Sequence, residues 1–79
     1  MAPADYAPPA KRSVLIAGHA TSISLEPAFW RALEKAARER NCTVNALVAE
    51  IDAERFNVRP PPNLTSAIRQ WLFAKAQGT

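Results

Sequence analysis

The chain contains little of what small enzymes and secreted miniproteins depend on. Its 79 residues include only two glycines, one cysteine and one histidine. The single Cys42 cannot form a disulfide within the chain, and Cys42 together with His19 supplies too few ligands for a structural zinc site. With two glycines, a glycine-rich loop that cradles phosphate groups is excluded as well. A disulfide scaffold, a zinc module and a nucleotide-binding loop are therefore all ruled out.

Catalytic and membrane-directed patterns are missing too. The sequence shows no Ser-His-Asp set and no pair of carboxylates in a polar cluster. No stretch approaches the ~18 uninterrupted apolar residues of a membrane span. The N-terminal residues MAPADYAPPAKR lack the basic-then-apolar order of a secretory signal. We therefore expect a cytoplasmic protein that is not an enzyme, binds no metal and no cofactor, and does not enter a membrane.

What remains is a small folded chain with few means of stabilising itself. Its hydrophobic fraction of 48% is ordinary for a globular domain. A domain of this size buries only about 60% of the surface that its unfolded chain exposes, so it usually depends on a disulfide, a metal or another chain. Because the first two are excluded, we expect an oligomer. The formal net charge of +3 weakly favours a polyanionic partner such as nucleic acid.

The sequence divides into four parts. Residues 1–12 are rich in proline and alanine and end in two basic residues, which is typical of a flexible basic arm. Residues 13–56 combine one short strand with two helices. Residues 57–62 form a proline spacer, and residues 63–79 form a C-terminal helix.

The strand is clearest where polar and apolar residues alternate, over residues 21–25. Side chains alternate across a strand, so Ile23 and Leu25 share one face while Ser22 and Ser24 share the other. We expect the first pair to face the core and the serines to face outward.

Three helices are expected after this strand. Pro27 suits the first position of a helix, Asn41 suits a left-handed end, and Thr43 suits the cap of the next helix. The apolar face of the strand and the apolar stripes of the first two helices are expected to form the core of a dimer: Ile23, Leu25, Phe29, Trp30, Leu33, Val44, Leu47, Val48 and Ile51. A further apolar stripe on the third helix is expected to face a partner: Leu64, Ile68, Trp71 and Leu72. For Trp71 and Phe73 on this helix, packing on the dimer is favoured over a surface for another protein.

A lone strand leaves its backbone donors and acceptors unpaired. The economical solution is a two-fold dimer in which the strand pairs antiparallel with its twin. A hairpin within the chain is the competing solution, with residues 14–17 against residues 21–25 around Gly18 and His19.

The order and spacing of two short motifs resemble a known family. S-I-S-L-E-P-A-F-W at residues 22–30 and N-C-T-V-N-A-L-V at residues 41–48 resemble the ribbon-helix-helix fold of the Arc/MetJ superfamily. K-R-S-V-L-I-A-G-H-A-T-S-I-S-L-E-P at residues 11–27 is similar to a subgroup of small bacterial ribbon-helix-helix proteins. The resemblance covers residues 11–56. It implies a mainly helical fold with one short strand, an intertwined homodimer with an intermolecular two-stranded antiparallel ribbon, and here an added third helix.

The same resemblance implies a sequence-specific, DNA-binding transcriptional regulator, of the repressor type, that binds double-stranded DNA as a homodimer or higher oligomer. Its ribbon enters the major groove, and the start of its second helix binds a backbone phosphate. The expected DNA contacts are Lys11, Arg12, Ser22, Ser24, Thr43 and Asn45. The chain departs from the family pattern in two ways: the outward face of the strand carries no basic or amide side chain, and Asn41 replaces the common loop glycine.

Two other functions remain open at this point. One is an antitoxin-like module whose residues 63–77 bind a partner protein. The other is an interaction dimer that never touches DNA, which the uncharged outward face of the strand would suit.

Overall fold

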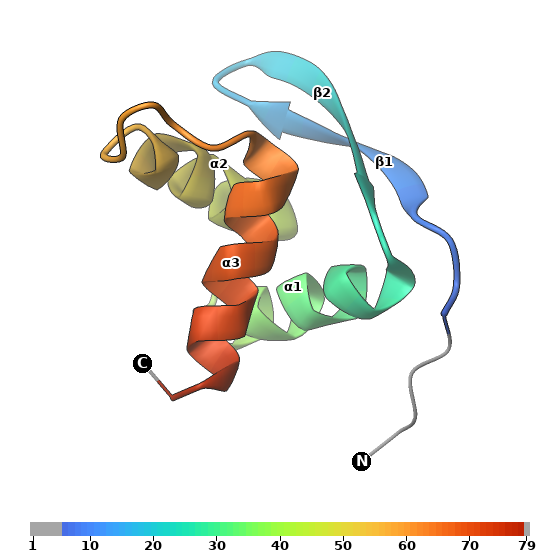
Figure 1. The fold of residues 1–79 in the computed structure, drawn as a ribbon. Coiled ribbons are helices and arrows are strands. Elements are labelled where there is room, and N and C mark those ends of the chain that lie inside the picture. The colour runs from blue at the N-terminus through green and yellow to red at the C-terminus, as the bar shows by residue number, and fades with distance from the viewer. Residues whose placement is uncertain (1–5, 79) are drawn as a thin grey trace.

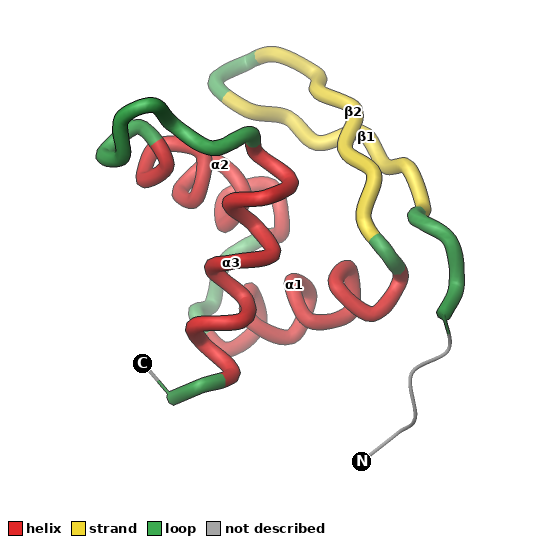
Figure 2. Tube along the Cα trace, in the orientation of Figure 1, coloured by secondary structure: helices red, strands yellow, loops and turns green. Residues whose placement is uncertain are grey.

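The computed structural model describes residues 6–78, and it begins with two strands followed by three helices (Figure 1). The strands lie together along one side of the helices (Figure 2). The element bounds are β1 Ala10–Ile16, β2 His19–Leu25, α1 Pro27–Glu39, α2 Val44–Arg55 and α3 Leu64–Ala76. Of the arm expected at residues 1–12, residues 10–12 belong instead to β1, and residues 1–5 lie outside the described part of the chain.

The two strands form a hairpin inside the chain. β1 pairs antiparallel with β2 in a continuous register that runs from Ala10 opposite Leu25 to Ile16 opposite His19. The expectation of one short strand was therefore wrong, because a second strand precedes it and supplies its partner. The hairpin alternative describes the pairing better, although the strands are longer and the turn lies one residue earlier. One side of β2 is thus paired without a second chain.

The turn of the hairpin is formed by Ala17 and Gly18. Both have positive φ angles, 51° and 81° respectively. This pattern is that of a type I′ turn, whose twist matches the twist of the flanking strands. Gly18 adopts such an angle without penalty, whereas an alanine there is strained.

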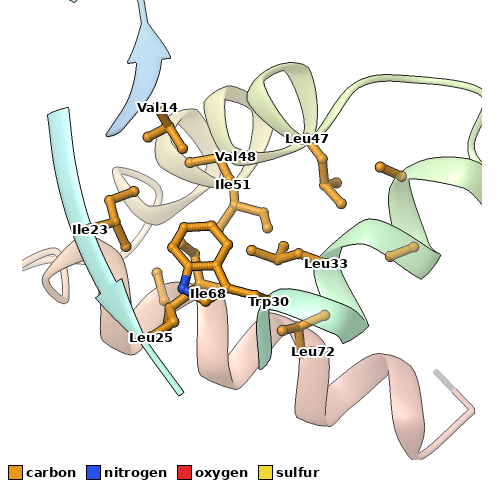
Figure 3. Close-up of a cluster of buried hydrophobic side chains, with 13 residues drawn as sticks. Val14, Ile23, Leu25, Trp30, Leu33, Leu47, Val48, Ile51, Ile68 and Leu72 are labelled. Carbon is orange, nitrogen blue, oxygen red and sulfur yellow. The ribbon is translucent and has the colours of Figure 1, made fainter. Parts of the chain in front are cut away.

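The core lies between the hairpin and the three helices. Trp30 lies at its centre, with Ile23 on one side and Leu33 on the other (Figure 3). Its indole nitrogen donates a hydrogen bond to the carbonyl of Ala10, at 2.8 Å, which ties the start of β1 to α1. Most of the residues expected in a dimer core are buried here within one chain, and Phe29 and Val44 are partly buried at its edge.

The third helix completes this core. Ile68 is fully buried, and Ala67 and Leu72 are nearly so. The spacer that precedes α3 is fastened to α2, because Arg55 donates a hydrogen bond to the carbonyl of Pro62 at 3.1 Å. The apolar stripe of α3 therefore packs on its own domain, as favoured for Trp71, and does not face a separate protein.

The helix boundaries follow from local chemistry, as expected. Pro27 stands at the start of α1, and Asn41 has a positive φ of 54° just after its end. The hydroxyl of Thr43 accepts a hydrogen bond from the backbone N–H of Ala46 at 3.0 Å and so caps α2. The side chain of Asn63 caps α3 in the same way. These caps fix where α2 begins relative to the hairpin.

Candidate nucleic-acid interface

The outward face of the hairpin is open to solvent; it is polar at Lys11, Ser13, Ser22 and Ser24 and carries the exposed apolar Leu15 nearer the turn. The register places Lys11 opposite Ser24 and Ser13 opposite Ser22. Because side chains alternate across a strand, these four residues lie on the same face, away from the buried Val14 and Ile23. All four are exposed. The structure therefore adds Ser13 to the outward serines predicted from the sequence, and it adds a neighbouring cation.

Lys11 supplies the positive charge that β2 by itself lacks. Many other cations are paired: Arg12, Arg40, Arg55, Arg69 and Lys75 each form an ion pair with a carboxylate. Within residues 6–78, no carboxylate pairs with Lys11. The outward face thus carries one unneutralised cation beside three hydroxyl groups, which can donate or accept hydrogen bonds.

Arg12 is separated from this group. It lies on the opposite face of β1, where its guanidinium is 4.7 Å from the centre of the Trp30 ring. One of its nitrogens donates to Glu34 Oε2 at 3.1 Å. Arg12 thus links β1 to α1 through Trp30 and Glu34. It does not lie together with Lys11 and the serines.

The start of α2 lies against the hairpin. The hydroxyl of Thr43 is occupied by the cap, which leaves the backbone N–H groups of Val44 and Asn45 without acceptors inside the helix. The side-chain oxygen of Asn45 accepts a hydrogen bond from the backbone N–H of Leu15 at 3.2 Å. The edge of β1 and the positive end of the α2 dipole are therefore neighbours.

Comparison with known proteins identifies the family to which this fold belongs. A family model described as a ribbon-helix-helix domain matches residues 9–76. The chain belongs to this ribbon-helix-helix family. No curated protein and no solved structure matches the chain.

Ribbon-helix-helix proteins are in general DNA-binding regulators that bind DNA as dimers. In this ribbon-helix-helix chain the match extends past the residues 11–56 that carried the resemblance in sequence, and it takes in α3. Ser13, on the outward face of β1, was not among the contacts predicted from the sequence. Continuing the alternation of residues 21–25 back through a two-residue turn would have found it.

The described residues offer neither a membrane span nor a metal site. None of the helices within residues 6–78 combines the length and the apolar character needed to cross a bilayer. The same part of this ribbon-helix-helix chain contains no group of three or more His, Cys, Asp or Glu side chains that could hold a metal ion.

Proposed function

We propose that this protein is a sequence-specific, DNA-binding transcriptional regulator that acts as a homodimer and represses the genes it controls. The observation that carries the proposal is the outward face of the hairpin, where Lys11 lies across from Ser24 and beside two further serines. A β-ribbon fits the major groove of DNA, and serine hydroxyls can reach base edges there. The protein has no catalytic role in this proposal.

The contacts divide between bases and phosphates. Ser22 and Ser24 contact base edges and so contribute to sequence preference. Lys11 and the free N–H groups at the start of α2 contact phosphates, which fixes the register of the protein on the duplex. Thr43 acts through the cap that it gives α2. Arg12 is excluded from these contacts because it is bound to Trp30 and Glu34.

An antitoxin-like function finds less support. It requires a C-terminal segment that is free until a partner protein binds it. In the structure, α3 is docked through the buried Ile68 and Leu72 and through an ion pair between Arg69 and Glu26. Removing α3 from its own domain would expose this apolar surface, which disfavours a role as a detachable arm.

The proposal is tested by the double substitution Ser22→Glu and Ser24→Glu. DNA sequences are first selected from a random pool with the wild-type protein, and binding is then measured by fluorescence anisotropy. We expect the double variant to remain folded and to lose binding, because two carboxylates then face the phosphates and bases.

The matched control is Ala28→Glu with Gln70→Glu, which changes the net charge equally at exposed positions of α1 and α3. Its DNA binding should stay close to that of the wild type. Equal binding by the two double variants would refute the part of the proposal that gives base contacts to Ser22 and Ser24. If no sequence is recovered from the selection, the whole proposal is refuted and an interaction dimer that does not bind DNA is favoured.

A further inference from the structure

The outward face of the hairpin changes character along its length. Away from the turn its cross-strand pairs are polar, whereas the pair nearest the turn is apolar, with Leu15 opposite Ala20. Leu15 is 54% exposed, and the alternation of side chains places it with Lys11 and Ser13, away from the buried Val14. The face assigned to DNA contact therefore has a polar part and an apolar part, and the contacts proposed so far use only the polar part.

The backbone of Leu15 is fixed to α2. Its N–H donates a hydrogen bond to Oδ1 of Asn45 at 3.2 Å. Asn45 is the second residue of α2, so its own backbone N–H is one of those left free to bind a phosphate. When the start of α2 binds a phosphate, the side chain of Leu15 is therefore held in one position in the neighbouring part of the groove.

The domain itself does not require an apolar residue here. Within residues 6–78, Leu15 belongs neither to the buried cluster nor to the partly buried side chains packed against it. A strand with one face in solvent usually carries polar residues on that face, as Ser13 illustrates. Single exposed apolar residues are common on protein surfaces, but this one lies on the face that would enter the groove. It needs an apolar group on the DNA to pack against.

The major groove offers one such group. The base edges there present hydrogen-bond donors and acceptors, together with the C5 methyl group of thymine. Leu15 cannot satisfy a donor or an acceptor, and Ala20 beside it has no polar side-chain atom either. A methyl group is therefore the feature of a base pair that this end of the hairpin fits. A cytosine methylated at C5 presents the same group.

We propose that Leu15 recognises thymine by packing its side chain against the C5 methyl group in the major groove. The inference rests on the proposed function and deepens it, because it adds a specificity-determining residue to the same face. Serine hydroxyls both donate and accept hydrogen bonds, so Ser22 and Ser24 discriminate little between bases. An apolar contact favours thymine over cytosine at its position, and Leu15 thus adds a preference that the serines do not supply.

The first test uses the wild-type protein and a duplex recovered from a random pool. Each thymine of that duplex is replaced in turn by uracil, which differs from thymine only in lacking the C5 methyl group. Binding is measured by fluorescence anisotropy. We expect one thymine in each half-site at which the replacement weakens binding by about fourfold, because the burial of one methyl group is lost. If no replacement weakens binding, the inference is wrong.

Leu15→Ala connects this preference to the side chain. Because Leu15 is exposed, the variant should remain folded, which circular dichroism checks. It should bind the thymine and uracil duplexes equally well, as a double-mutant cycle requires of two groups in contact. Phe73→Ala is the matched control, because it truncates an exposed apolar side chain of α3 and should keep the preference of the wild type.

Retention of the thymine preference by Leu15→Ala overturns the inference. If the variant also binds both duplexes more weakly by the same factor, Leu15 belongs to a contact between protein chains instead.

A second pair of duplexes separates the methyl group from the shape of the DNA. The critical thymine is replaced by cytosine in one duplex and by 5-methylcytosine in the other, each paired with guanine. Wild-type protein should bind the methylated duplex more tightly, by about the same fourfold factor, and Leu15→Ala should not distinguish the two. Equal binding of both duplexes by the wild type would assign the uracil effect to duplex shape and overturn the inference.

Failure of the inference is separable from failure of the proposed function. A protein that binds the recovered duplex but ignores the methyl group overturns only the inference. A protein for which no sequence is recovered overturns both.

Discussion

The guanidinium of Arg69 donates two hydrogen bonds to Oε1 of Glu26, at 3.0 Å from Nη2 and 3.3 Å from Nε. Glu26 links β2 to α1, and Arg69 is in the middle of α3. The same guanidinium lies 5.7 Å from the centre of the Phe29 ring. This contact joins the last helix to the point where the hairpin ends, and it makes α3 part of the domain.

Glu26 should make the stability of the domain depend on acid pH. The pKa of its carboxyl is lowered below 4.5, first by hydrogen bonding to its own backbone and then by the Arg69 side chain. A lowered folded-state pKa means that this stabilisation is complete above pH 4.5 and is lost as the pH falls through the folded-state value. We expect Glu26→Gln to remove this acid-dependent loss, measured by urea unfolding at a series of pH values.

Glu54→Gln is the control for this measurement. Glu54 is an exposed carboxylate in α2, and no ion pair involves it within the described residues. Its variant should keep the pH dependence of the wild type. If Glu26→Gln and wild-type protein give parallel curves below pH 4.5, the carboxyl of Glu26 does not carry the effect.

Truncating a buried side chain of α3 should destabilise the domain much more than truncating an exposed one. Ile68 is fully buried, whereas the side chain of Phe73 is 66% exposed. We expect Ile68→Ala to lower the free energy of unfolding by about 2–5 kcal/mol, because it leaves a cavity in the core. Phe73→Ala should change it by no more than about 0.5 kcal/mol. Denaturant unfolding of both variants decides the matter, and similar losses would show that α3 is not docked as described.

The two basic residues at the start of β1 should have different roles. Lys11→Ala should reduce the dependence of DNA affinity on salt by about one to two units of slope per dimer, because two phosphate contacts are lost. Arg12→Ala should leave that slope unchanged and lower the free energy of unfolding by up to about 1 kcal/mol, since it removes the contacts with Trp30 and Glu34. Titrations at several salt concentrations distinguish them, and an equal change of slope for both would contradict this division.

Substitutions at the two positions of the hairpin turn should change the stability of the domain in opposite directions. Ala17 has a left-handed backbone, which asparagine tolerates better than alanine, so Ala17→Asn should raise stability by about 1 kcal/mol. Gly18→Ala should lower it, and a Cβ at Gly18 would meet no atom within 4 Å, so the cost comes from the backbone angle. Thermal unfolding measures both. Changes of the same sign would mean that the turn has another conformation.

The helices were predictable because their signals are local. Pro27 at the start of α1 and Thr43 as the cap of α2 act within a few residues of their own position, and the structure confirms both. The alternation over residues 21–25 likewise predicted which side chains face the core, and Ile23 and Leu25 are buried.

What each of these elements packs against or pairs with was not predictable in the same way. An apolar stripe such as that of α3 indicates which face is buried but not what covers it, and here α3 covers its own domain. The sequence left the partner of β2 open between a twin strand and a hairpin, because a two-residue turn with alanine in a left-handed conformation is an uncommon signal. The position of Arg12 over the Trp30 ring was not predictable either, because no local signal in the sequence shows that these two residues meet.

The hydrogen bond from the indole of Trp30 to the carbonyl of Ala10 has a consequence for the outward face of the hairpin. It holds the first residue of β1 against α1, and Lys11 is the next residue along that strand. The cation that we propose to contact phosphate is therefore positioned from the buried core of the domain, so a loosened core should also blur the position of its charge.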